Sequence, residues 1–158
     1  MKRLKTYGLR FVAFRSICLF FLPGLLCCER SSDEKIILKE TRIEHLVLFK
    51  FRQDITLKEK QEVVRRFMAL KNAKKDGVLY ITSIEYGEQN SKEGVSKGYE
   101  IAFRVSFTSV EDRDYYVGKP FQSNPGTFDP NHDAFKDFVG PYLNSDNGVL
   151  VFDYKPTK

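Results

Sequence analysis

The chain has 158 residues, a formal net charge of +5, three cysteines and two histidines. This length suits one domain with a single core. Five of the 26 basic residues lie within residues 1–27, which hold no acidic residue, so the remaining 21 basic and 21 acidic side chains balance. Binding to nucleic acid needs clustered Lys and Arg in excess. We therefore expect no nucleic-acid partner for the domain.

Residues 1–27 have the pattern of an export signal. Cations spread over residues 2–15 precede an apolar run over residues 17–26, which is the order of the n-region and h-region of a secretory signal. The run is shorter than the ~20 apolar residues of a membrane-spanning helix, and Pro23-Gly24 would interrupt a helix near its end.

The apolar run ends in a sequence that resembles a bacterial lipobox, in which a leucine stands three places before the cysteine that is lipidated. Leu25 has this relation to Cys28, while Cys27 occupies a place usually taken by glycine, alanine or serine. The resemblance implies lipidation at Cys28, a tether over residues 28–41 and anchoring in the membrane of a bacterial cell envelope. An ordinary secretory segment, a misassigned start codon and processing at Cys27 are the alternatives.

The cysteines are confined to this first segment. Cys18, Cys27 and Cys28 all precede the expected domain. The domain therefore has no disulfide and no thiol nucleophile, and two histidines without cysteine offer little for a structural zinc site. We expect neither a metal nor a cofactor.

The first expected strand covers residues 43–51. Its residues are largely apolar, β-branched or aromatic, and their alternation puts His45, Val47 and Phe49 on one face. Leucines occupy the other face. Because both faces are apolar, we expect this strand to be buried on both sides.

A helix is expected next, beginning with the capping box Thr56-Leu57-Lys58-Glu59 and continuing to about residue 72. Leu57, Val64 and Phe67 fall on one stripe that should pack on a sheet. Residues 80–86 and 99–107 are expected strands, and the second of them alternates strictly with period two.

The last third of the sequence predicts two more helices and a strand. Thr108, three residues before Glu111, is expected to cap a short helix that ends near Gly118. Proline, glycine and asparagine indicate a loop over residues 119–128. Asp129-Pro130 should begin the next helix, with Asp129 as its N-cap. That helix should end at Gly140-Pro141, and residues 149–154 form the last strand.

This order of elements predicts an α+β, ferredoxin-like fold: a four-stranded antiparallel sheet with helices on one face. Roughly 115 residues can cover only one face of such a sheet. Since the other face is also apolar, we expect a second copy of the chain to cover it, which makes the protein a homodimer.

Three segments resemble the stress-responsive A/B barrel family: His45-Leu46-Val47-Leu48-Phe49-Lys50-Phe51, the stretch from Asp129 to Phe135 around His132, and residues 149–154. The resemblance covers about residues 43–155, and we assign the domain to residues 42–156. It implies a dimeric α/β barrel in which one sheet face lines an interior. If His45, Val47 and Phe49 lie on that face, they are the candidate ligand-binding residues.

The resemblance also suggests a catalytic pair. Plant members of the family that cyclise linear polyketides use a tyrosine and a histidine as acid and base, without metal or cofactor, in the pattern tyrosine, then His-Pro-x-His-x-x-Phe. Tyr116 and His132 match the tyrosine and the second histidine, with Tyr115 as a competitor for the first. Lys119-Pro120 replaces His-Pro, and eleven residues separate Pro120 from His132 where the pattern has one.

The chemistry implied for the pair is proton transfer. An imidazole can take a proton from a carbon next to a carbonyl near neutral pH, and a tyrosine hydroxyl can stabilise the resulting enolate. We interpret His132 and Tyr116 as candidate catalytic residues, with the loop of residues 121–128 as a lid. The alternative is structural: His132 orients the start of its helix, and His45 is a core residue.

Two functional hypotheses follow. In the first, the protein is an anchored dimeric barrel that binds a small apolar or aromatic molecule without catalysis. In the second, it is a cofactor-independent enzyme, a cyclase or a monooxygenase, acting on polyketide-like compounds.

Overall fold

The computed structural model describes residues 42–157. The expected export signal, the lipidation site Cys28 and the tether over residues 28–41 lie outside the described residues. The elements in chain order are β1 (Ile43–Phe49), α2 (Leu57–Ala69), η1 (Leu70–Asn72), β2 (Lys74–Lys75), β3 (Val78–Leu79), β4 (Ile81–Glu88), β5 (Ile101–Phe107), α3 (Val110–Val117), α4 (Pro130–Val139), η2 (Gly140–Tyr142) and β6 (Val149–Tyr154).

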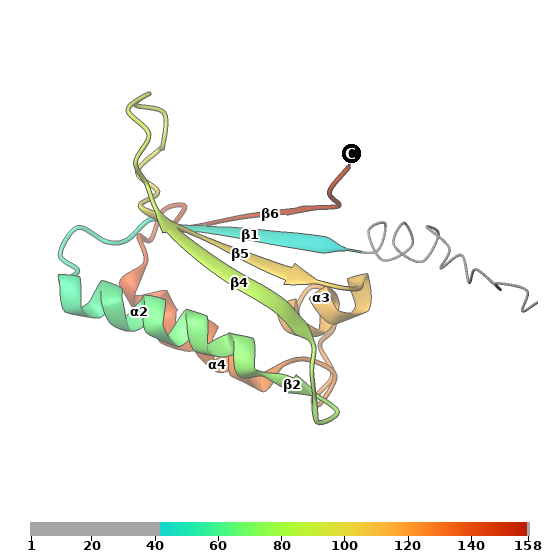
Figure 1. Ribbon diagram of the computed structural model, residues 1–158. Helices are drawn as coiled ribbons and strands as arrows, with labels where there is room; N and C mark the ends of the chain where they lie inside the picture. The colour runs from blue at the N-terminus through green and yellow to red at the C-terminus, as the bar shows by residue number, and fades with distance from the viewer. Residues whose placement is uncertain (1–41, 158) are drawn as a thin grey trace, which may run out of the picture. The chain divides into compact units, whose positions relative to one another are not determined.

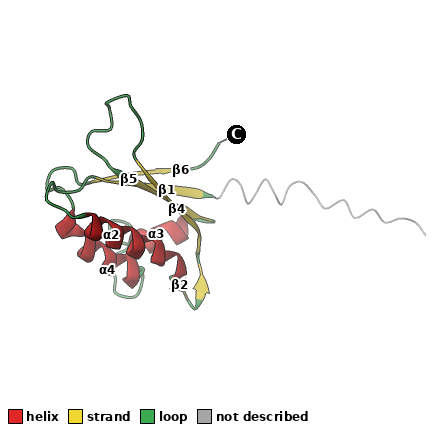
Figure 2. Cartoon of the chain, turned by 60° about the vertical axis from the view of Figure 1, so that its left-hand side comes forward, coloured by secondary structure: helices red, strands yellow, loops and turns green. Residues whose placement is uncertain are grey.

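Four strands form one antiparallel sheet in the order β4, β5, β1, β6. The helices α2, α3 and α4 all lie on the same side of it (Figures 1 and 2), and no helix within residues 42–157 covers the opposite side. The predicted α+β, ferredoxin-like fold with helices on one face is confirmed.

The core lies between this sheet and the helices. The alternation of β5 places Phe103, Val105 and Phe107 in it, each with no exposed surface. Helix α2 contributes Val63 and Phe67, and the ring of Phe67 stacks on that of Phe103 at a centroid distance of 3.7 Å. Such close packing fixes the helix on the sheet.

The predicted buried stripe of α2 is partly wrong. Phe67 is buried as expected, but Leu57 is 71% exposed and Val64 is only half-buried. The buried series runs through Val63, Phe67 and Leu70 instead. Leu57 is the first residue of the helix and lies beyond the part of α2 that packs on the sheet. Including Leu57, an apolar residue at the start of the helix, in the stripe therefore put the predicted buried face in the wrong place.

The helix starts follow the capping signals, with one shift. Thr56 and Glu59 form the predicted capping box of α2, and Asp129 caps α4 by accepting a hydrogen bond from the amide of Asn131. Helix α3 begins one residue later than expected, because the side chain of Ser109, and not of Thr108, accepts from the amide of Asp112 at 3.1 Å. A serine and a threonine are adjacent there, and both are good N-caps.

The hairpin of β2 and β3 was not predicted. Asp76 and Gly77 connect its strands with φ of 51° and 81°, the left-handed conformation that an Asp-Gly turn of type I′ requires. The first strand is also shorter than expected, because β1 ends at Phe49 and Phe51 makes only an isolated bridge to Leu143.

Residues 42–157 contain neither a membrane-spanning helix nor a metal-binding cluster. No helix there has the length and apolar character needed to cross a bilayer. The same residues contain no group of three or more His, Cys, Asp or Glu side chains arranged to hold a metal ion.

Candidate functional site

A cavity of about 530 Å³ lies between the helix-facing side of β1 and β6 and the helix α4. We call it the histidine cavity. Its lining residues are His45, Val47, Phe49, Phe67, Val117, Lys119, Pro120, Phe121, His132, Phe135, Lys136, Val139, Gly140, Leu143, Val149, Val151 and Asp153. His45, Val47 and Phe49 lie together on the helix-covered face of the sheet, not on the face expected to line the interior of a dimeric barrel, so the cavity that they line lies within the protomer.

His132 has a defined hydrogen-bonding state. Its Nδ1 lies 2.6 Å from the backbone oxygen of Tyr116, and since a carbonyl oxygen only accepts, Nδ1 carries the proton. Burial lowers the pKa of His132 to about 4, despite the opposing effect of this hydrogen bond. The imidazole is therefore neutral at pH 7, which leaves Nε2 unprotonated and able to accept a proton or a hydrogen bond.

His45 belongs to a second arrangement. Its Nδ1 lies 2.6 Å from Oδ1 of Asp153, and Arg113 donates to the other carboxylate oxygen. Burial by itself would raise the pKa of Asp153, but the hydrogen bond from His45 and the contact with Arg113 outweigh it and hold that pKa below its ordinary value. Asp153 is therefore a carboxylate, and it orients the His45 ring through Nδ1.

Tyr116 lies behind the two histidines and does not line the cavity. Its ring stacks on His132 at 3.8 Å and meets the edge of His45 at 5.7 Å. Its hydroxyl is buried and has no hydrogen-bond partner among residues 42–157. Burial first, and Asp129 second, raise the pKa of Tyr116 well above its ordinary value. Its competitor Tyr115 is also absent from the lining and packs against Tyr80.

His132 contacts Tyr116 in the structure, although eleven residues separate Pro120 from His132 in the sequence. The amide of Asp129 donates to the carbonyl of Tyr115 at 2.9 Å, which closes the intervening loop at its base. Gly118 has φ of 68°, and a Cβ there would come within 3.3 Å of Phe128, so the close packing of the loop favours glycine at this place. Of the expected lid, residues 121–128, Phe121 lines the cavity.

Sequence reasoning missed Asp153, Arg113 and the lysines at the rim. Asp153 lies 108 positions from His45, and only the pairing of β1 with β6 sets them opposite each other. The sequence did contain a signal for Asp153. It is an acidic residue in an otherwise apolar expected strand, and the alternation of that strand puts it on the same face as Val149 and Val151. Such a residue either faces water or has a buried partner.

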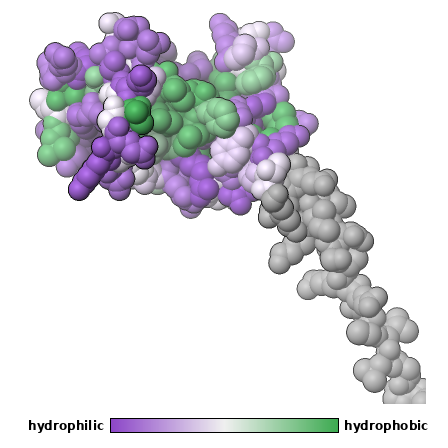
Figure 3. Space-filling view, turned by 90° about the horizontal axis from the view of Figure 1, so that it is seen from above, coloured by the Kyte–Doolittle hydropathy of each residue, from purple (hydrophilic) through white to green (hydrophobic). Residues whose placement is uncertain are grey.

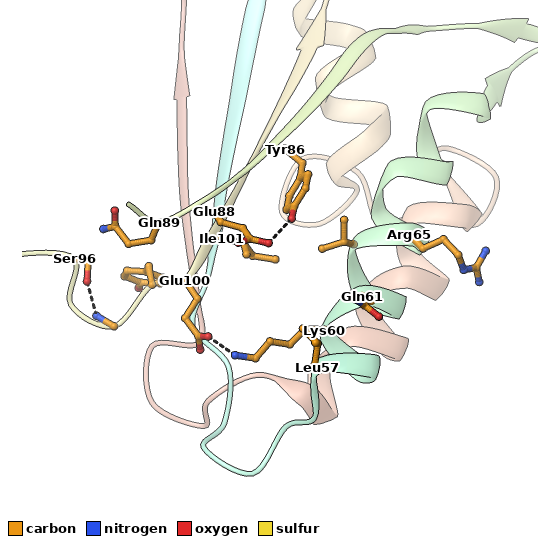
Figure 4. Close-up of a pocket in the computed structure, with 13 residues that line it drawn as sticks. Leu57, Lys60, Gln61, Arg65, Tyr86, Glu88, Gln89, Ser96, Glu100 and Ile101 are labelled. Carbon is orange, nitrogen blue, oxygen red and sulfur yellow. Dashed lines mark hydrogen bonds and ion pairs between the residues drawn. The ribbon is translucent and has the colours of Figure 1, made fainter. Parts of the chain in front are cut away.

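A larger hollow of about 730 Å³ lies elsewhere, between α2 and β4 (Figure 4). Its charged side chains are largely matched within it: Lys60 pairs with Glu100, and the hydroxyl of Tyr86 donates to Glu88. None of the residues that the sequence marks as site residues lines it. We therefore place the candidate site in the histidine cavity.

The neutral state of His132 predicts a pH dependence of stability. Its pKa falls from an ordinary 6.5 to about 4 on folding. Above pH 6.5 the neutral imidazole therefore costs the folded protein nothing, and as the pH falls from 6.5 toward 4 the free energy of unfolding decreases. We expect the free energy of unfolding to fall by about 2 kcal/mol more between pH 7 and pH 5 in the native protein than in His132→Gln. Denaturant unfolding at one protein concentration measures this. Equal pH dependence of the two proteins would contradict a buried neutral His132.

Comparisons with known proteins agree with this architecture. The sequence profile of the Stress responsive A/B Barrel Domain matches residues 43–156. Olivetolic acid cyclase from Cannabis sativa is 28% identical over 116 residues, which cover 73% of this chain and 98% of the cyclase. The stress-response A/B barrel domain-containing protein HS1 from Arabidopsis thaliana is 25% identical, covering 73% of this chain and 90% of HS1.

The fold also has counterparts among solved structures. One is described as a dimeric ferredoxin-like protein of unknown function from Jannaschia sp.. It superposes with a TM-score of 0.54 at 20% sequence identity, over 73% of this chain and 99% of that protein. At this identity the similarity shows the fold alone.

Proposed function

The chain belongs to the stress-responsive A/B barrel domain family, and on this basis we propose that it is a homodimeric protein that binds a small apolar molecule in the histidine cavity. One observation carries the proposal. The cavity has apolar walls and only a few polar groups, among them the two histidines, and its volume of about 530 Å³ falls in the range of small-molecule sites, ~300–1,000 Å³.

The polar groups of the cavity are suited to orienting a ligand. Nε2 of His132 accepts a hydrogen bond, while Nδ1 of each histidine is already occupied by a protein acceptor. A hydroxyl of an otherwise apolar ligand can therefore donate to His132 while the remainder contacts Phe49 and Phe135.

Filling the cavity should abolish binding without unfolding the protein. Val151 lines the cavity and is 52% exposed, so tryptophan at this edge position can occupy cavity space with little cost to the core. We expect Val151→Trp to weaken the binding of 1-naphthol or decanol by roughly tenfold or more, since it removes contact area from the ligand. Isothermal titration calorimetry measures the dissociation constants.

Val78→Trp is the matched control, because Val78 is exposed on the β2–β3 hairpin and does not line the cavity. It should bind both probes as the native protein does. If neither probe binds the native protein, or if Val151→Trp and Val78→Trp behave alike, the proposed ligand site is wrong.

The proposed homodimer rests on the side of the sheet that the helices leave bare, which we call the outer face. Its apolar residues are Leu46, Leu48, Ala102, Leu150 and Phe152. Figure 3, which looks onto the molecule from the side of the sheet, shows hydrophobic residues gathered there. The description of the Jannaschia protein as dimeric supports the same assembly for this chain.

A second candidate function is proton-transfer catalysis of the cyclase type. It is favoured by the neutral His132 in an apolar cavity and by the similarity to olivetolic acid cyclase. If His132 is the base, His132→Gln should lower the turnover of a linear polyketide thioester by roughly 10²-fold, because glutamine cannot take the proton. Unchanged turnover in His132→Gln would exclude the catalytic role.

We also propose that the chain is exported and anchored in a bacterial envelope through a lipid on Cys28. The support is the basic segment before an apolar run and the spacing of Leu25 and Cys28. Mass spectrometry of the native N-terminus tests this. An intact Met1, or an unlipidated chain starting elsewhere, would contradict it.

A further inference from the structure

The histidine cavity has an uneven distribution of charge. Its inner wall is apolar and buried, with Phe49, Phe67, Phe135 and Val139 all below 6% exposed. Its exposed rim contains two lysines, Lys119 and Lys136. An apolar interior with cations at the opening fits a ligand that has an apolar body and an anionic end.

Both lysines line the cavity close to the end of α3. Nζ of Lys136 reaches the backbone oxygen of Val117, the last residue of α3, at 3.4 Å. Lys119 follows Val117 by two positions. Lys119 and the ammonium group of Lys136 are therefore both close to Val117, which lines the cavity.

Neither lysine is neutralised by a buried partner. Lys119 makes no ion pair within the part of the chain that the structure describes. Lys136 pairs with Asp133 at 3.0 Å, but both side chains are more than 40% exposed, and such pairs contribute little. The carboxylate of Asp153, which also lines the cavity, is held by His45 and by Arg113, whose positive charge offsets it there; Arg113 also contacts Asp114.

We propose that the histidine cavity selects apolar molecules bearing one carboxylate, with the carboxylate at Lys119 and Lys136 and the apolar body against Phe49, Phe67 and Phe135. This inference rests on the proposed ligand-binding function and adds the chemical class of the ligand. An exposed ion pair adds modest affinity, but the attraction is directional and sensitive to salt. Selectivity for the anion, and not affinity alone, is therefore the property to measure.

The test compares three probes of equal chain length: decanoate, decanol and decyltrimethylammonium. We expect the native full-length protein to bind decanoate roughly tenfold more tightly than decanol, and the cation most weakly, as two ammonium groups near the ligand imply. In the double variant Lys119→Met, Lys136→Met this preference should disappear while the affinity for decanol stays within about twofold. The double variant Lys58→Met, Lys92→Met, which changes two lysines outside the cavity lining, should retain the preference.

The outcomes separate the two proposals. If decanol and decanoate bind equally, or if the rim variant keeps the preference, the anionic class is wrong and the ligand cavity stands. Tighter binding of the cation would also overturn the anionic class. If no probe binds at all, the ligand-binding function itself fails, and this inference fails with it.

Discussion

Replacement of Phe103 by alanine should destabilise the domain by about 3–5 kcal/mol, the cost typical of removing a fully buried phenylalanine. Phe103 has no exposed surface. Its ring stacks on Phe67 and lies 5.5 Å from Phe49 and 5.8 Å from Tyr86. It thus joins helix α2 to three adjacent strands, and neighbouring side chains can fill the resulting void only in part.

Phe121→Ala is the matched control, because it removes the same atoms from a side chain that is 48% exposed. We expect it to cost less than about 1 kcal/mol. Denaturant unfolding at a fixed protein concentration measures both variants. If Phe103→Ala costs no more than Phe121→Ala, the Phe67–Phe103 stack is not the centre of the core.

The strands were predictable because their pattern is local. Every second residue of β5 is apolar, and the structure buries Ile101, Phe103, Val105 and Phe107 as this alternation indicates. In β1 the structure likewise buries His45, Val47 and Phe49, with half-buried leucines between them. A period of two is unaffected by small errors in the ends of a strand.

The buried face of α2 and the β2–β3 hairpin were not predicted correctly. In α2 an error of one position rotates the stripe by ~100°, so an apolar Leu57 at the helix start sufficed to shift the predicted face. The β2–β3 hairpin is only two residues long on each side, too short for alternation to show. The dipeptide Asp76-Gly77, which favours a tight turn, was the one signal in the sequence for this hairpin.

The candidate site depends on contacts between residues far apart in the sequence, which local patterns do not predict. The two histidines could be assigned to one site from the resemblance to a family, and the structure brings them to one cavity. The partner of His45 could not be assigned in this way, because the pairing of Asp153 with His45 depends on the register between β1 and β6. Lys136 reaches the end of α3, two residues before Lys119, only because α4 packs against that end, and no pattern within either helix encodes that packing.

The outer face gives the prediction with the largest effect on assembly. Phe152 lies on the edge strand β6, opposite Leu46 of β1, and is 58% exposed in the protomer. In a face-to-face dimer it would be buried, and two-fold symmetry would place any change there twice in the interface. The polar end of the same face has partners within the protomer, because the buried carboxylate of Glu44 accepts a hydrogen bond from Ser106 and forms an ion pair with Arg42.

Phe152→Asp should therefore dissociate the dimer while leaving the protomer folded. Two carboxylates buried in an interface of ~800 Å² per partner cost several kcal/mol, which corresponds to a dissociation constant raised by roughly 10³-fold or more. Sedimentation velocity at micromolar concentration should show a dimer for the native protein and a monomer for the variant. The circular dichroism spectrum should be unchanged.

Leu79→Asp is the control, since Leu79 is also 58% exposed but lies in the β2–β3 hairpin outside the four-stranded sheet. It introduces the same charge at a side chain of equal exposure, and it should remain dimeric. A native protein that sediments as a monomer would contradict the homodimer. If Phe152→Asp stays dimeric, or if both variants dissociate equally, the interface must lie elsewhere, and the apolar residues of the outer face must have another partner.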